Sequence, residues 1–288
     1  MCIALRTRSM PSSVESNTTA SSAGRVSVEV STNGREYTAS GVQFELVSLS
    51  VRGIAPWSGP VLGGTVVTLA GVGFVDVGLR CRFGSMELVG ASVSSGSEVV
   101  CVSPVAAQTG WVGVELVSDG ESLRSGGSFF VHSRLWVSAM LPVLGPVSGG
   151  TRLTVLGSHF REATTLRCRF DERSKTVTAR HVGAGQLECA TPVQSGAGSR
   201  AVEVSLNAQQ FSTSGVAFTY VPTVALSSVW PSRGASEGGT AVTVHGSGFA
   251  SASEALGYLQ CRIGGVVRRA RWASSRAVVC ETARLGVG

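Results

Sequence analysis

Hydrophobic and polar residues alternate along short segments of the chain. Val67 and Leu69 fall on one face of such a segment, and Thr68 falls on the other. The same arrangement recurs at 153–155 and at 242–244. A period of two is typical of a β-strand with one buried face. The pattern therefore predicts half-buried strands that recur along the chain.

These segments belong to a longer repeat, P-x-x-G-x-x-x-G-G-T-x-(V/L)-T-(V/L)-x-G-x-x-F, which covers 56–74, 142–160 and 231–249. The prolines are 86 and then 89 residues apart, and eight positions are identical in all three copies. The Pro and the first Gly fit a turn, the Gly-Gly pair fits a bend with positive φ, and the Phe returns to the core. The signature residues are Pro56, Gly59, Gly63, Gly64, Thr65, Gly71, Phe74, Pro142, Gly145, Gly149, Gly150, Thr151, Gly157, Phe160, Pro231, Gly234, Gly238, Gly239, Thr240, Gly246 and Phe249.

Three further segments follow each signature. The first is L-x-C-R-(F/I), at 79–83, 166–170 and 259–263, with Leu, Cys and Phe or Ile predicted to point inward. The second carries another cysteine. The third is a strand, a turn and a strand, at 114–130 and 202–218, and the same piece occurs near the N-terminus at 28–44 without gaps. The chain is therefore predicted to begin inside one repeat and to stop inside another.

This organisation predicts five regions. Residues 1–25 are rich in Ser and Thr and are expected to be loose, 26–48 form the back half of a repeat, and 49–134 and 135–223 are complete repeats. Residues 224–288 form a repeat without its final strands. We expect the chain to be a fragment of a longer array or the translation of an incomplete gene model.

The signature, the two cysteines and the proline three residues after the second cysteine (Pro104 or Pro192) resemble IPT/TIG domains. The resemblance covers about 28–288, although Glu281-Thr282 follows the last cysteine without the proline. It implies an all-β chain of tandem immunoglobulin-like β-sandwich modules, a fold shared by plexins and other large surface receptors, the fibrocystin family and Rel-type transcription factors. It leaves the function open, because this fold is reused for adhesion, stalks, dimerisation and accessory modules of carbohydrate enzymes.

Six of the seven cysteines form pairs at separations of 20, 21 and 19 residues. The repeat predicts three disulfides, each closing a loop and stabilising its module by about 3 kcal/mol, in an oxidising extracellular or cell-surface compartment. Free buried thiols remain an alternative. A zinc site would need closer Cys or His spacing than the sequence has, and Cys2 is left unpaired. The predicted pairs are Cys81–Cys101, Cys168–Cys189 and Cys261–Cys280.

Composition adds two limits on function. The net charge is +6 and Lys175 is the only lysine, but charged residues are 15% of the chain and the only arginine cluster is Arg268, Arg269 and Arg271. This electrostatic footprint is sparse for a nucleic-acid binder and fits a solvated strand edge. No apolar run reaches the roughly 20 residues of a membrane span, and no signal peptide is recognisable at the N-terminus.

Candidate catalytic or metal chemistry is weak, and no cofactor is predicted. The four histidines lack ligand spacing, and Gly234–Gly238 matches G-x-S-x-G in a β-module loop rather than a strand-to-helix turn. Calcium between modules stays open. Asn17-Thr18-Thr19 is a glycosylation sequon. The tryptophans at 57, 111, 136, 230 and 272 are expected to pack against the core or a neighbouring module rather than to form ligand platforms.

The main hypothesis is a non-enzymatic extracellular interaction or adhesion scaffold that binds a protein or a glycan. Its linkers are short, so the array should be elongated. One alternative is an intracellular Rel-type dimerisation or DNA-contacting module, which the tandem cysteine pairs oppose. The other is an accessory domain of a secreted carbohydrate-active enzyme.

Overall fold

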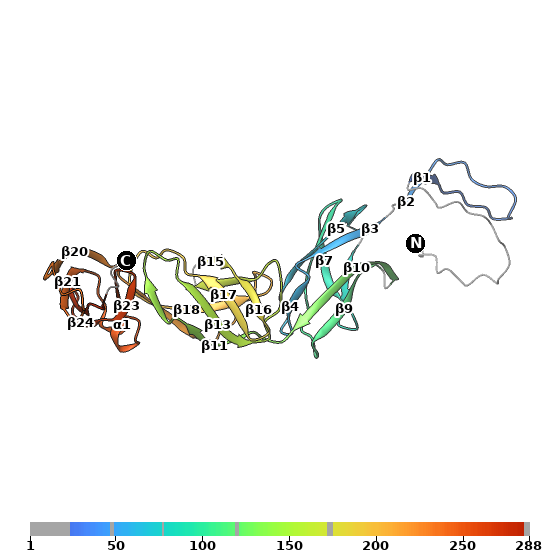
Figure 1. Cartoon of the computed structure of the whole chain (residues 1–288). Helices are drawn as coiled ribbons and strands as arrows, with labels where there is room; N and C mark the ends of the chain where they lie inside the picture. Colours follow the sequence, from blue (N-terminus) through green and yellow to red (C-terminus); the bar gives the residue numbers. More distant parts are fainter. Residues whose placement is uncertain (1–23, 47–48, 77, 119–120, 172–174, 285–288) are drawn as a thin grey trace.

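The computed structural model describes residues 24–46, 49–76, 78–118, 121–171 and 175–284, as a row of three β-modules preceded by a hairpin (Figure 1). The sequon at Asn17 and the unpaired Cys2 lie outside the described residues. The hairpin pairs two antiparallel strands, β1 (Gly24–Ser27) and β2 (Gln43–Leu46). Strand β1 begins inside the segment 1–25 that was predicted to be loose, so that boundary was placed too late.

The first module is a β-sandwich whose strands form one eight-stranded sheet, in the order β3-β5-β8-β7-β6-β9-β10-β4. Strand β7 pairs with both β6 and β8 and so joins the two layers. The strands are β3 (Ser50–Ala55), β4 (Ser58–Pro60), β5 (Val66–Val72), β6 (Arg80–Phe83), β7 (Val89–Ser95), β8 (Glu98–Val102), β9 (Gly110–Ser118) and β10 (Glu121–His132).

The second module has two separate sheets, in the orders β11-β13-β17-β16 and β12-β19-β18-β14-β15. Its core of aromatic and aliphatic side chains lies between them. The strands are β11 (Trp136–Leu141), β12 (Leu144–Pro146), β13 (Arg152–Ser158), β14 (Arg167–Phe170), β15 (Lys175–Thr178), β16 (Arg180–Gly183), β17 (Gln186–Ala190), β18 (Gly198–Ser205) and β19 (Ala217–Val221).

The third module has one four-stranded sheet, β20-β21-β25-β24, and only a two-stranded remnant of the other, β22-β23. Among the described residues it contains no counterparts of β12, β18 and β19. Its elements are β20 (Ala225–Trp230), β21 (Ala241–Ser247), α1 (Ser251–Ala255), β22 (Gln260–Ile263), β23 (Val266–Arg269), β24 (Arg271–Ser274) and β25 (Ala277–Glu281).

The predicted strand faces are confirmed in the first two modules. The residues at the positions of Val67, Leu69 and Phe74 are buried in all three modules. In the third copy of L-x-C-R-(F/I), however, Leu259, Cys261 and Ile263 are only half-buried. The strands that cover this face in the other modules have no counterpart among the described residues of the third, so the inward prediction was only partly right.

The gapless match of the last strands was off by one residue. A Cβ placed on Gly59 would lie 2.8 Å from the ring of Phe129, and one placed on Gly145 would lie 2.9 Å from the ring of Phe218. Phe129, rather than Phe130, therefore occupies the position of Phe218. Val114 and Val202 are equivalent, so the segment that leads to this phenylalanine is one residue longer in the second module than in the first.

Candidate functional site

Each predicted cysteine pair is joined by a disulfide in the structure. The Cα–Cα distances are 6.3 Å for Cys81–Cys101, 6.5 Å for Cys168–Cys189 and 6.1 Å for Cys261–Cys280. In the first two modules the bond links the strand after the signature loop (β6 or β14) to the strand opposite it (β8 or β17), inside the core. The disulfides therefore tie together the two layers of the sandwich.

The signature residues build the loops at one end of each module. Gly149 and Gly150 have φ of 72° and 80°, as the predicted bend requires. A Cβ on Gly149 would lie 2.7 Å from the backbone of Thr191 and Pro192, whereas nothing lies within 4 Å of one on Gly150. Gly63 and Gly238 make the same close approach in the other modules. These residues shape the fold and carry no reactive group.

The histidines do not converge on a site. Burial lowers the pKa of His132, whose Nδ1 lies 2.8 Å from the carbonyl oxygen of Ser133. His159 Nδ1 lies 3.1 Å from the carbonyl oxygen of Arg134 in the linker to the second module. Among the described residues, no group of three or more His, Cys, Asp or Glu side chains is placed to hold a metal ion.

The G-x-S-x-G match lies in an exposed loop before β21, where the Ala235 amide donates to Thr240 Oγ1 at 3.2 Å. A nucleophile elbow would lead from a strand into a helix, and this loop leads into a strand.

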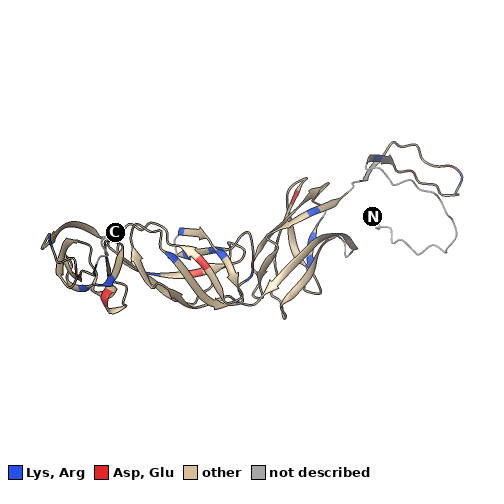
Figure 2. Cartoon of the chain, in the orientation of Figure 1, with Lys and Arg blue, Asp and Glu red and all other residues tan. Residues whose placement is uncertain are grey.

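Basic and acidic residues are dispersed over the modules (Figure 2). Arg268, Arg269 and Arg271 are exposed on the strands β23 and β24. In the described part of the chain, no helix is long and apolar enough to span a bilayer.

The packing prediction for the tryptophans was wrong at Trp136 and Trp230, and it was only partly right at Trp111, which stacks on Trp57 but stays largely exposed. Trp111 is 60% exposed and Trp230 is 71% exposed, and Trp136 is also exposed. Trp136 is the first residue of β11 and Trp230 is the last residue of β20. Trp57 and Trp272 are half-buried, and the Trp272 indole donates to the carbonyl oxygen of Phe249 at 3.2 Å.

An aromatic cluster lies beside the junction of the first two modules. The rings of Trp57 and Trp111 stack with centroids 5.7 Å apart, and Phe130 lies 5.2 Å from Trp111. The Arg161 guanidinium of the second module lies 4.1 Å from the Phe130 centroid. Tryptophan and arginine are enriched among the residues that dominate binding interfaces. The cluster therefore offers a surface that a partner could contact.

The same junction is closed by a polar loop, residues 205–211, which we call the clamp loop. Asn207 is buried, and its Nδ2 donates to the carbonyl oxygen of Ser58 at 3.1 Å and to Thr65 Oγ1 at 3.3 Å. Its Oδ1 accepts the backbone amides of Gln209 and Gln210 at 3.0 and 3.1 Å. Asn207 therefore holds its own loop in shape and binds the first module at the same time.

Two glutamines extend this contact. The Gln209 amide pairs with the backbone of Val66, accepting from its N–H and donating to its carbonyl oxygen, both at 2.8 Å. Gln210 donates to the carbonyl oxygen of Gly64 at 2.8 Å and accepts from Thr65 Oγ1 at 3.0 Å. The side chains thus pair with the first module much as a neighbouring strand would, which restricts bending at this junction.

Sequence reasoning missed the clamp loop, although a signal was present. The pattern Ser-x-Asn-x-x-x-(Phe/Tyr) occurs at 205–211 and again at 31–37, at the same offset as the surrounding strands. No prediction was made for these polar residues, whose partners lie more than 140 residues away in the sequence.

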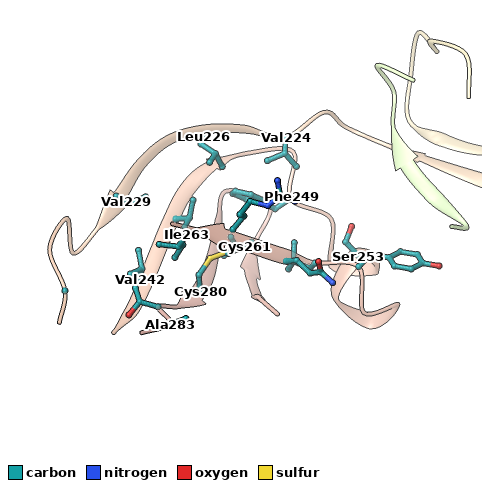
Figure 3. Close-up of a pocket in the computed structure, with 18 of the residues that line it drawn as sticks. Val224, Leu226, Val229, Val242, Phe249, Ser253, Cys261, Ile263, Cys280 and Ala283 are labelled. Atoms are coloured by element: carbon teal, nitrogen blue, oxygen red, sulfur yellow. A yellow bond between two sulfur atoms is a disulfide. The ribbon is translucent and has the colours of Figure 1, made fainter. Parts of the chain in front are cut away.

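An apolar groove of about 860 Å³ opens in the third module, next to the end of the second (Figure 3). Val242, Phe249, Ile263 and the Cys261–Cys280 disulfide line it. Leu226 is 67% exposed, whereas Val137, its counterpart in the second module, is fully buried. The groove is therefore the interior face of a sandwich, and among the described residues no strands cover it.

Disulfide-containing sandwiches joined by three-residue linkers define a tandem immunoglobulin-like protein. The sequence profile of the IPT/TIG domain matches residues 49–132, 136–220 and 225–288. The chain therefore belongs to the IPT/TIG domain family.

Curated relatives and solved structures agree with this assignment. Plexin-B2 of Mus musculus is 28% identical over 207 residues, which cover 68% of this chain and 11% of that protein. Fibrocystin-L of Homo sapiens is 27% identical over 254 residues, covering 83% of this chain and 6% of that protein. The extracellular region of plexin A4 matches with a TM-score of 0.50 and 19% identity, over 89% of this chain and 23% of that chain. This chain thus spans a small part of the length of these relatives.

Proposed function

We propose that the chain is a non-enzymatic extracellular or cell-surface scaffold that presents binding surfaces for protein or glycan partners from a semi-rigid row of modules. The observation that carries the proposal is the clamped junction between the first two modules. There, side-chain amides from the clamp loop bind the backbone at 64–66. The three disulfides support an oxidising location.

The aromatic cluster supports the binding role. Trp111 is held by Trp57 and Phe130 yet remains largely exposed, so little side-chain entropy is lost when a partner covers it. Arg161 brings a cation from the second module to the same surface. A contact surface built from two modules needs a junction of fixed geometry, which the clamp loop provides.

The fixed geometry of the junction between the first two modules depends on Asn207. Asn207→Asp puts a carboxylate oxygen opposite the Ser58 carbonyl and the Gln210 Oε1, which the Asn207 amide now bonds at 3.1 and 2.6 Å. We expect the closed junction to be destabilised by about 2–3 kcal/mol. In small-angle scattering, the wild-type chain should give an elongated particle, and the variant a broader distribution of distances. Ser94→Asp, which adds the same charge at an exposed position of β7, is the control. A compact wild-type particle would contradict the proposed semi-rigid row of modules.

Partner binding depends on Trp111. We expect Trp111→Ala to weaken the binding of labelled chain to intact cells by about tenfold or more, because exposed tryptophans beside arginine commonly dominate interfaces. Trp230→Ala removes an even more exposed indole at the far end of the row and serves as the control. Binding to enzymatically deglycosylated cells separates a glycan from a protein partner. Equal loss with both variants would count against the aromatic cluster as the contact surface.

A further inference from the structure

Three aromatic residues on the outer face of the first module have no aromatic counterpart in the second. Equivalent positions follow from the strand pairing of β10 and β19, and from the hydrogen bond that each of these strands donates to the residue before β4 or β12. By this pairing, the counterparts of Trp57, Trp111 and Phe130 are Val143, Ser199 and Thr219. The second sandwich folds without these rings, so the fold alone does not explain them.

The aromatic cluster holds one ring open to a ligand. The Trp57 and Trp111 rings are 23° from parallel, and their centroids are 5.7 Å apart. Phe130 is 8% exposed, whereas Trp111 remains 60% exposed. The Trp111 ring is therefore fixed in orientation by its neighbours while most of its surface faces solvent.

The outer face of β9 beyond Trp111 is flat. Residues 111, 113 and 115 lie on this face, because Val112 and Val114 pack against the core on the other. A Cβ placed on Gly113 would have no atom within 4 Å. Its partner on β10 is the exposed Ser128. Strand β9 thus carries no side chain between Trp111 and Glu115 on the outer face.

An ion pair lies at the far end of this flat stretch. Arg82 Nε and Nη2 donate to Glu115 Oε2 at 3.1 and 2.7 Å, and Ser122 Oγ donates to the same oxygen at 3.1 Å. The two charged side chains are 34% and 38% exposed. Hydrogen bonds from Arg82 and Ser122 lower the pKa of Glu115, so its carboxylate stays ionised near neutral pH. The pair therefore presents both hydrogen-bond donors and acceptors to solvent.

The second module uses the equivalent charged residues for its own structure. Glu203, the counterpart of Glu115, is 7% exposed and accepts backbone amides of the loop before β19. Arg169, the counterpart of Arg82, lies 4.2 Å from the centroid of the Phe211 ring. Of the two complete modules, only the first combines the exposed aromatic ring with an open ion pair.

We propose that this face of the first module binds a neutral oligosaccharide, with one sugar stacked on Trp111 and a later sugar bonded to Arg82 and Glu115. This rests on the proposed function, to which it adds the chemical class of the partner and the extent of the site. One side of a pyranose ring presents C–H groups that pack on an aromatic ring. Its hydroxyl groups both donate and accept hydrogen bonds, as the ion pair requires.

The spacing of the site indicates a chain of sugars. Trp111 and Glu115 are four residues apart in one strand, which separates their Cα atoms by roughly 13 Å. A single sugar ring is too short to reach both. The absence of a side chain at Gly113 leaves room for the sugars between them.

The charges on this face favour a neutral sugar over the other ligand classes. An acidic glycan would be repelled by the ionised Glu115, which also neutralises Arg82. Beyond the aromatic cluster the face consists of glycine, serine and charged side chains. Charged residues are depleted at the centre of protein interfaces, so this part of the face suits a protein partner poorly.

Gly113→Val is the most specific test of the proposal. The variant should fold, because open space surrounds the new Cβ and valine is favoured in strands. Its side chain would stand between Trp111 and Glu115 and lift a sugar chain off the face, so we expect affinity to fall by about tenfold or more. Ala201→Val adds a similar side chain at the equivalent position of the second module and should bind as the wild type does.

The measurement is binding of the full chain to an array of immobilised oligosaccharides, both neutral and sulfated. We expect binding to neutral glycans of several sugars that persists in high salt. Trp111→Ala and Glu115→Gln should each weaken it by about tenfold. The proposal is overturned if no neutral glycan binds, or if Gly113→Val binds as well as the wild type. Binding to sulfated glycans alone, lost in high salt, would overturn it as well.

Cells separate this proposal from the broader scaffold function. If the chain binds intact and deglycosylated cells equally, and Trp111→Ala abolishes both, the scaffold function stands with a protein partner and the sugar site is wrong. If Trp111→Ala binds intact cells as well as the wild type does, the aromatic cluster is not the contact surface and both proposals for it fail.

Discussion

Gly149→Ala is expected to destabilise the second module by about 3–4 kcal/mol, whereas Gly150→Ala should cost only about 1–2 kcal/mol. Both glycines have positive φ, so an alanine at either position meets the same backbone penalty. Only at Gly149 does the new Cβ also collide with backbone atoms of Thr191 and Pro192, at 2.7 Å. Backbone atoms of a hydrogen-bonded segment cannot shift without a loss of stability. The difference in stability between the two variants therefore measures the free-energy cost of the steric clash at Gly149.

Hydrogen exchange of peptides from β13 and β17 is the suitable measurement, because it reports the stability of each module separately. The loss of protection against hydrogen exchange should be confined to the second module, including its clamp loop. Equal destabilisation by the two variants would show that positive φ alone explains the paired glycines. The same contrast should hold for Gly63 and Gly64, where the close approach is 2.6 Å.

Most of the strands could be predicted from the sequence because their signals are local. Alternation places Leu153 and Val155 on one face whatever the rest of the chain does, and Gly-Gly marks the bend before them. Burial was less predictable, because it depends on what covers the face. Val137 and Leu226 occupy the same position in β11 and β20, yet one is fully buried and the other is 67% exposed.

The surfaces proposed here for interaction were largely invisible in the sequence. Asn207 and Gln209 are polar residues in a loop, and only the structure brings them to Ser58 and Val66 of the first module. Trp111 was expected to pack, and it does contact Trp57, but the contact holds its ring at the surface instead of covering it. Contacts between modules therefore needed three-dimensional information that the repeat does not contain.

The second large effect is expected from the double substitution Cys168→Ala and Cys189→Ala, which should destabilise the second module by about 3 kcal/mol. The bond closes a segment of 21 residues and ties β14 to β17 across the core. Its loss enlarges the unfolded ensemble and leaves two buried alanines in place of the sulfur atoms. For a domain of this size the unfolding temperature should fall by more than roughly 10 °C.

Scanning calorimetry measures this shift, and the substitution of Cys81 and Cys101 by alanine provides the matched experiment in the first module. Peptide mapping of the wild-type chain without reduction is also needed, because it identifies which cysteines are linked. It should find three linked pairs and one free thiol, at Cys2. Free thiols at the six core positions would contradict the pairing and with it the oxidising location. A small shift with intact wild-type disulfides would instead mean that core packing of the sandwich, rather than loop closure, carries most of the module's stability.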